Sequence, residues 1–368
     1  MLRLFAIVVF CAAAAIGQDE QRAHQYESGE IRVSGAWADE PLAEFSASRA
    51  ADYLTGGAVA WSRQKGCVTC HTNGTYGVIR PALTKELGPP DKEVRDFYIS
   101  ELTEFQKVKV EDLYSGTNSA QVIYIAASLA EWDASVTGEL SEETDTALRM
   151  MFSAQKETGT WSSLDCWPPF ESSAYQEATV AAMAMGTAPG WLKSIEEDEE
   201  LQKSIALLKT YLKETSPPHE YAHVLRLWAS SRVAGLLSES DRMAGLELLA
   251  SKQKSDGGWS IRAFAQPEEW GGGNRAEKLK GEPEFEDPPS DGHMTGLALI
   301  VLQANGVTPD RPAIQRGVKW LKENQRESGR WWTRSLNTDG PHYITYSGTA
   351  YPLLALKLAG ELKTETDK

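Results

Sequence analysis

Two cysteines and a histidine with the spacing C-x-x-C-H lie in the segment QKGCVTCHTNG, residues 64–74. They are Cys67, Cys70 and His71. Two thiols three positions apart can form a disulfide, bind a metal as thiolates or act as nucleophiles, and an imidazole is a common metal ligand. The spacing therefore predicts a redox or metal centre, and the rest of the chain must indicate which chemistry it is.

The pentapeptide resembles the haem-attachment motif of c-type cytochromes, in which both thiols add to haem vinyl groups and the histidine binds the iron. The resemblance covers the motif alone and implies haem c on Cys67 and Cys70, with His71 as an axial ligand. Arg80, soon after the motif, is a candidate partner for a propionate. Either the iron is five-coordinate or a second axial ligand comes from elsewhere in the chain, the candidates being His219, His223, His293, His342, Met183, Met185 and Met294.

Three alternatives to haem stay open at this point. Cys67 and Cys70 can form a structural or redox disulfide. With His71 and Cys166, which lies in the loop GTWSSLDCWPPFE, they make a set of four ligands that suits tetrahedral zinc. The two cysteines can also have no role.

The first 17 residues are typical of a secretory signal peptide, with Arg3 before an apolar run and small residues at its end. We therefore expect an exported, periplasmic or otherwise extracytoplasmic protein, with an N-terminal linker at 18–42 and a short tail at 363–368. Haem c is attached outside the cytoplasm, so export and the C-x-x-C-H motif support each other.

The net charge is −15, which argues against nucleic acid and anionic membranes as partners. No segment after the first 17 residues is apolar for long enough to cross a bilayer, so no stable membrane insertion is expected. The acidic run at 196–200 is interpreted as a solvated first helical turn.

A repeat organises the chain. Three segments share an amphipathic helix that ends at Gln, a polar turn with Gly, and Trp six positions after the Gln: ALRMMFSAQKETGTW (147–161), GLELLASKQKSDGGW (245–259) and GVKWLKENQRESGRW (317–331). The segment AVAWSRQKGCVTC aligns as a fourth copy, with Gln64 at the Gln position and Cys70 at the Trp position. Such self-similarity predicts a repeat architecture, with the C-x-x-C-H motif in a repeat turn.

Apolar periodicity predicts helices with almost no strand signal. The expected helices lie near 43–55, 57–65, 92–108, 117–132, 141–155, 173–186, 198–214, 219–236, 238–253, 292–305, 311–324 and 343–361. Twelve helices make about six hairpins, which can close into an all-α double ring, an (α/α)6 toroid, over 43–362. The C-x-x-C-H loop at 66–91 and a Gly/Pro/Glu-rich insertion at 261–291 interrupt it; whether the insertion is a lid or unstructured stays open.

The Gln-Trp repeat resembles the QW repeat of squalene and oxidosqualene cyclases, a helical toroid that protein prenyltransferase β-subunits share. The resemblance covers about residues 45–362 and implies a central cavity for an apolar small molecule. The resemblance is specific for the fold but gives only weak evidence of function, because one fold hosts many activities. We expect the Gln and Trp residues to tie neighbouring hairpins together, Gln at a helix end and Trp over the next helix terminus.

Two departures from these families limit the activities that the resemblance implies. The sequence contains no D-x-D-D, the motif with which squalene cyclases protonate an alkene, so protonation-initiated cyclisation is not expected. Asp291-Gly292-His293 resembles the helix start that carries the zinc-binding His of prenyltransferases, but no cysteine stands at the matching position.

Two functional hypotheses result. One is an exported toroid with haem c that transfers electrons to a redox partner protein or carries out a redox step on a cavity ligand. The other is a cofactor-free or zinc-binding toroid that acts as a terpenoid- or prenyl-handling enzyme or as a binding scaffold.

Overall fold

The computed structural model describes residues 40–163, 168–170, 173–271, 274–282, 284–336 and 344–363. Within these ranges the chain is helical, and the only β-type pairing is an isolated antiparallel bridge between Pro41 and Arg326. The predicted signal peptide, most of the 18–42 linker and nearly all of the tail lie outside the described residues.

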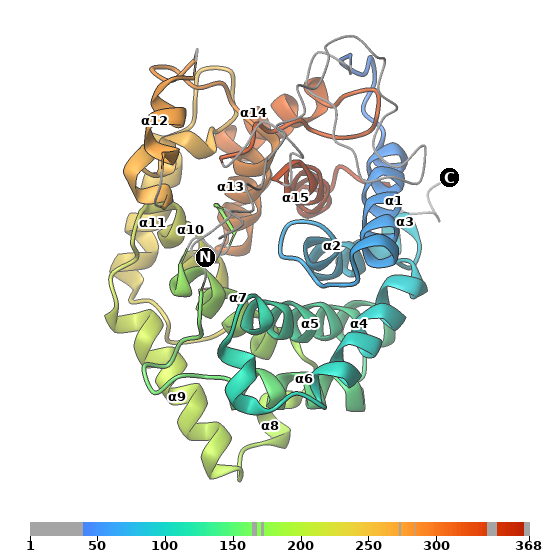
Figure 1. Ribbon diagram of the computed structural model, residues 1–368. Coiled ribbons are helices and arrows are strands. Elements are labelled where there is room, and N and C mark those ends of the chain that lie inside the picture. The colour runs from blue at the N-terminus through green and yellow to red at the C-terminus, as the bar shows by residue number, and fades with distance from the viewer. Residues whose placement is uncertain are drawn as a thin grey trace, which may run out of the picture.

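Helix pairs follow one another around a ring (Figure 1). The outer helices are α1 (Ala47–Lys65), α4 (Lys92–Phe105), α6 (Glu142–Ser153), α9 (Glu199–Glu214), α11 (Glu239–Ser251) and α14 (Pro312–Glu323). The inner helices are α2 (Asn73–Ile79), α5 (Asn118–Trp132), α7 (Ala174–Thr187), α10 (Glu220–Ser230), α13 (Gly292–Ala304) and α15 (Ile344–Leu358). Each inner helix contacts the next, and α15 contacts α2. The predicted (α/α)6 toroid of six hairpins is therefore confirmed.

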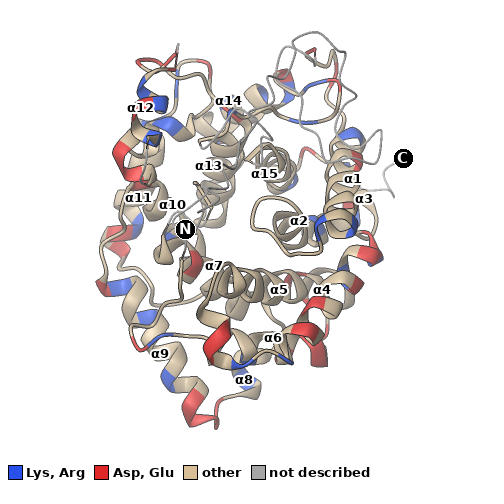
Figure 2. Cartoon of the chain, in the orientation of Figure 1, with Lys and Arg blue, Asp and Glu red and all other residues tan. Residues whose placement is uncertain are grey.

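The outer and inner helices differ in how much of their surface is buried. Outer helix α9 buries Leu201, Ile205, Leu208 and Leu212, a stripe on one face of the helix. Inner helix α13 instead buries every residue from Gly292 to Leu302, because it has neighbours on all sides. Charged side chains accordingly gather on the outer helices and the connecting loops (Figure 2).

The repeated Gln and Trp make the same contacts in three turns. The indole N–H of Trp161, Trp259 and Trp331 donates to the carbonyl ten residues earlier, at 2.8, 2.7 and 2.8 Å. Each Gln amide donates both to a glycine carbonyl of its own turn and to a backbone carbonyl in, or just before, the next outer helix. Gln253, for example, donates to Gly257 O and Ala313 O, both at 2.8 Å. The predicted structural role is confirmed for Gln, which ties neighbouring hairpins together. The hydrogen bond of each Trp instead goes to the end of its own outer helix.

The first hairpin differs from the prediction. Residues 43–55 and 57–65 were expected to form two helices, but they form the single helix α1, which continues through Gly56 and Gly57. Packing of α1 against α2, α4 and α15 outweighs the roughly 1 kcal/mol that each interior glycine costs a helix. The inner helix of this hairpin is α2, inside the segment that was expected to be a loop.

The rest of that segment is also helical, with a 3₁₀ turn η2 (Arg80–Leu83) and the short helix α3 (Thr84–Leu87). Gln64 does not match the other copies, because it lies inside the last turn of α1 and is exposed. The proposed fourth copy is therefore wrong at its Gln, although Cys70 is buried like the Trp residues.

Contacts between the last repeat turn and the first helix close the outer ring. Gln325 Nε2 donates to Ser46 O at 2.9 Å, and Gln325 Oε1 accepts from Ser46 N at 2.7 Å. Leu42 N donates to Gln325 O at 2.7 Å. The segment just before α1 is thereby held against the end of α14.

The described part of the insertion is folded, with 3₁₀ turns η5 (Ile261–Phe264) and η6 (Pro267–Trp270) and helix α12 (Arg275–Lys280). Trp270 is buried, and its ring lies 4.9 Å from that of His219 and 5.6 Å from that of Tyr221, measured between centroids. The insertion therefore packs over the start of α10.

Two predictions about the surface can be compared with the described residues. Asp198 caps α9 by accepting from Leu201 N at 3.2 Å and pairs with Arg149 at 2.9 Å, so the acidic run is a helix start, as predicted. No helix in the described ranges has the length and apolar character needed to cross a membrane.

Candidate functional site

The C-x-x-C-H motif lies between outer helix α1 and inner helix α2. Because every inner helix follows an outer one, the inner helices run parallel, and their N-terminal ends share one face of the ring. The repeat turns and the insertion lie on that same face. In Figure 1 the loop before α2 curves round the side of α2 that faces the middle of the ring.

The two cysteines of the motif differ in exposure. Cys67 is half-buried and Cys70 is 2% exposed, and both are thiols. Burial raises the pKa of Tyr124 on α5 and of Tyr351 on α15, and the nearby Cys70 raises both further. Cys70 therefore lies on the inner side of the loop, near tyrosines from two other inner helices, and not on an open rim.

His71 is buried and held in one orientation. Its Nδ1 lies 2.8 Å from Thr72 Oγ1, and its ring meets that of Trp61 edge to face at a centroid distance of 4.9 Å. Burial lowers the pKa of His71 to about 3. The imidazole is therefore neutral at physiological pH, which is the form that binds metal ions.

Asn73 organises the loop around the motif. Its side-chain oxygen accepts from Thr69 N at 2.8 Å and from Gly74 N at 3.0 Å, while its amide donates to Cys67 O at 3.1 Å. Tyr98 of α4 donates to Asn73 O at 2.5 Å. The sequence analysis missed Asn73, because a lone Asn after the motif carries no pattern that distinguishes it from other loop residues.

Arg80 has a structural role in place of the predicted propionate contact. Its guanidinium is buried and donates to Leu87 O at 2.8 Å and to Gly88 O at 2.9 Å. It therefore holds the end of α3.

The candidates for a second axial ligand are dispersed in the fold. His293 is fully buried, with Tyr221 Oη 2.9 Å from its Nε2 and Ser347 Oγ 2.7 Å from its Nδ1, so it is a core histidine. His219 caps α10 through Ala222 N. Met183, Met185 and Met294 are buried in the apolar core, and His223 is half-buried on α10. His342 lies outside the described residues.

The second group of candidate metal ligands surrounds Asp291 and His293 at the start of α13. Asp291 accepts from Met294 N and Ile261 N, both at 2.7 Å, so it acts as a cap for α13. Across the described ranges, no three His, Cys, Asp or Glu side chains are grouped to hold a metal ion. Cys166 lies outside those ranges, so the zinc hypothesis stays a prediction.

Aromatic rings gather inside the ring of helices, near the motif. The Tyr351 ring lies 5.0 Å from that of His293 and 5.7 Å from that of Trp228, measured between centroids. Tyr124, beside Cys70, accepts a hydrogen bond from Gln176 at 3.0 Å. The motif is therefore continuous with an interior that is aromatic and carries several hydroxyl groups.

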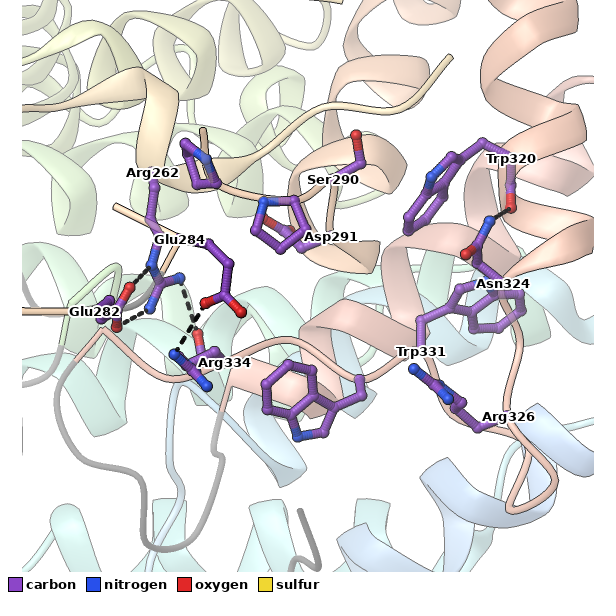
Figure 3. A pocket seen from close by; sticks show the side chains of 13 residues that line it. Arg262, Glu282, Glu284, Ser290, Asp291, Trp320, Asn324, Arg326, Trp331 and Arg334 are labelled. Carbon is purple, nitrogen blue, oxygen red and sulfur yellow. Dashed lines mark hydrogen bonds and ion pairs between the residues drawn. The ribbon is translucent and has the colours of Figure 1, made fainter. Parts of the chain in front are cut away.

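A separate pocket of about 250 Å³ lies on the same face of the toroid, where the insertion meets the last repeat turn (Figure 3). It is lined by Arg262, Glu282, Glu284, Pro288, Pro289, Ser290, Asp291, Trp320, Asn324, Arg326, Trp331, Trp332 and Arg334. None of the C-x-x-C-H residues lines it.

Comparison with known proteins agrees with the fold. Residues 245–361 match the squalene-hopene cyclase C-terminal domain. A probable squalene–hopene cyclase of Sinorhizobium fredii is 33% identical over 116 residues, which are 30% of this chain and 16% of that protein. The squalene–hopene cyclase of Bradyrhizobium diazoefficiens is 34% identical over 113 residues, which are 29% of this chain and 15% of that protein.

The closed double ring defines this protein as an α/α toroid. Residues 245–361 of the ring are similar to the C-terminal domain of squalene-hopene cyclases. The chain aligns with less than a fifth of the length of either cyclase. The matched segment contains the second half of α11, the insertion, α13, α14 and α15, but not the C-x-x-C-H motif.

Proposed function

We propose that this chain is an exported squalene cyclase-like toroid that carries haem c on Cys67 and Cys70, with His71 as an axial ligand. Its function would be electron transfer to a partner protein, or a redox step on a ligand inside the ring. When bound, haem c supplies one-electron chemistry at its iron.

The observation that carries the proposal is the state of His71. A haem ligand must be neutral and fixed in orientation, and burial together with the Thr72 hydroxyl meets both conditions. Asn73 fixes the backbone on both sides of Cys70 through Cys67 O and Gly74 N. The neutral, fixed imidazole and the ordered loop therefore support the proposal.

The surroundings favour a site that excludes water. Cys70 and His71 are 2% and 3% exposed, and Trp61, Tyr124 and Tyr351 lie around them. A poorly solvated site disfavours the extra positive charge of ferric iron, so we expect a raised reduction potential.

The test is covalent haem on the full chain. The protein would be expressed with its own N-terminus in cells that have an active haem c maturation system, then purified from the exported fraction. We expect a pyridine haemochrome spectrum of the c type and an intact mass increased by one haem. An exported chain of unmodified mass would overturn the proposal.

Two variants separate haem from zinc. Cys70→Ser should lose most covalent haem while the circular dichroism of the ring is unchanged, because hydrogen bonds of Asn73 and Tyr98 hold the loop. Cys166→Ser is the matched control and should leave the haem content unchanged. Loss of bound zinc in both variants, with no haem in either, would instead favour the site that includes Cys166.

The second candidate function, a terpenoid- or prenyl-handling protein without haem, is favoured by the match of residues 245–361 to the cyclase domain. Because the sequence lacks D-x-D-D, we expect the purified protein to return squalene unchanged. A cyclic product in this assay would favour the second function.

A further inference from the structure

We propose that the pocket between the insertion and the last repeat turn binds a neutral sugar ring. This inference does not depend on the proposed haem, because none of the motif residues lines the pocket.

The apolar surface of the pocket comes from rings held in fixed positions. Trp331 Nε1 donates to Leu321 O at 2.8 Å, and Trp320 Nε1 donates to Asp256 Oδ2 at 3.1 Å. Both N–H groups are used within the protein, and both indoles are buried, with Trp331 1% and Trp320 8% exposed. They therefore form fixed apolar walls of the pocket, of which little surface is open. Trp332, which is half-buried, and the rings of Pro288 and Pro289 add to that surface.

The charges around the pocket balance. Three arginines line it, Arg262, Arg326 and Arg334, and so do three acidic residues, Glu282, Glu284 and Asp291. Arg262 is held by Glu282 at 2.5 and 2.7 Å, and Arg334 lies 3.5 Å from Glu284 (Figure 3). A strongly anionic or cationic ligand would face like charges, so the lining favours a neutral one.

Polar groups at the edge are placed to bind hydroxyls. The Asn324 amide donates to Trp320 O at 2.8 Å, which leaves its side-chain carbonyl as an acceptor on an exposed residue. The Glu284 side chain is 54% exposed, so its carboxylate also reaches solvent. Neutral ligands with many hydroxyls match these acceptors.

The size of the pocket selects a small ring. Its volume of about 250 Å³ is below the ~300–1,000 Å³ typical of drug-sized ligands, so a polycyclic terpenoid is too large. A pyranose ring fits this combination, because its C–H groups can pack on the electron-rich indole of Trp332 and on the two proline rings, while its hydroxyls point to the polar edge.

The experiment is titration of the full chain with glucose, galactose, mannose, N-acetylglucosamine and their β-linked oligomers, followed by calorimetry and ligand-observed NMR. Trp332→Ala tests the aromatic surface. Trp132→Ala is the matched control, because Trp132 is also half-buried and has Arg95 over its ring at 5.7 Å, as Arg334 lies over Trp332 at 5.8 Å. Asn324→Ala, at an exposed site, tests the polar edge with little risk to folding.

We expect saturable binding of at least one of these sugars, weakened about tenfold or more by Trp332→Ala, and also by Asn324→Ala, but unchanged by Trp132→Ala. No binding of any of them at about millimolar concentration, the range of weak recognition, would overturn the proposal. So would binding that Asn324→Ala and Trp332→Ala leave intact, or a preference for sulfated sugars that disappears in salt.

Discussion

His71 and His293 are two imidazoles kept neutral inside the protein, each with a pKa lowered by burial to about 3. The unfolded chain binds protons at these groups below its ordinary pKa of 6.5, whereas the folded chain does so only near pH 3. The contribution of these two histidines to the free energy of unfolding is therefore fully present above pH 6.5 and is lost as the pH falls below that value.

The pH dependence can be assigned to His293 with one variant. Between pH 7 and pH 5, the titration of His293 should lower the free energy of unfolding by ~2 kcal/mol. His71 adds a similar loss only in chains without haem, because an imidazole bound to iron does not take up a proton. Asp291, whose pKa burial raises to about 6, partly offsets this fall, because its protonated form is favoured in the folded state. His293→Asn should reduce the loss between the two pH values by ~2 kcal/mol, as measured by urea unfolding. The same pH dependence in variant and parent would contradict this assignment.

Asn73 holds the loop of the motif in place, although no sequence pattern marks it as important. Its importance comes from the Thr69, Gly74 and Cys67 backbone groups that the fold brings around one amide. C-x-x-C-H, by contrast, is defined by residue types and spacing alone, so the motif could be found without the structure.

Helix α2 is the element that brings the motif into the ring, and it is tightly packed against α5. A Cβ on Gly77 would meet Ser128 Oγ at 2.2 Å and Tyr98 Oη at 2.6 Å. Gly77→Ala should therefore push α2 away from α5 and lower the free energy of unfolding by about 1–3 kcal/mol. Chemical denaturation measures this loss.

Gly281→Ala is the control for that prediction. Gly281 has a φ of −83°, and a Cβ there would meet nothing nearer than the Glu277 carbonyl at 3.3 Å. Its effect should be small. Equal losses of stability in the two variants would show that α2 is not tightly packed against α5.

Closure of the toroid is a property of the whole molecule and depends on Gln325. Its amide contacts Ser46 O, Ser46 N and Gly329 O, at 2.9, 2.7 and 2.8 Å. Gln325→Ala should cost about 2–3 kcal/mol, because it leaves buried backbone groups unbonded. We also expect faster hydrogen exchange in the first turn of α1.

Gln155→Ala is the control that tests whether faster exchange in α1 results from opening of the ring. Gln155 makes equivalent bonds to Gly159 O at 3.1 Å and Ser204 O at 3.0 Å, but between hairpins that the chain already connects. This variant should lose stability while the first turn of α1 exchanges as in the parent. Unchanged exchange in Gln325→Ala would argue that other contacts close the ring.

The sequence by itself determined the helical class, the repeat and every helix of the two rings except α2. Amphipathic spacing in α9 and the Gln-to-Trp interval in three turns are local patterns, so they can be recognised in the sequence without the structure. For the same reason the C-x-x-C-H motif and its candidate ligands could be located from residue types alone.

Only the tertiary structure decided where those residues lie. α1 continues through two glycines because its neighbours bury it, and α2 forms where a loop was expected. Cys70 meets Tyr124 and Tyr351 because the ring closes, and the sugar pocket combines an insertion with a repeat turn. Such contacts join segments far apart in the chain, so no local period encodes them.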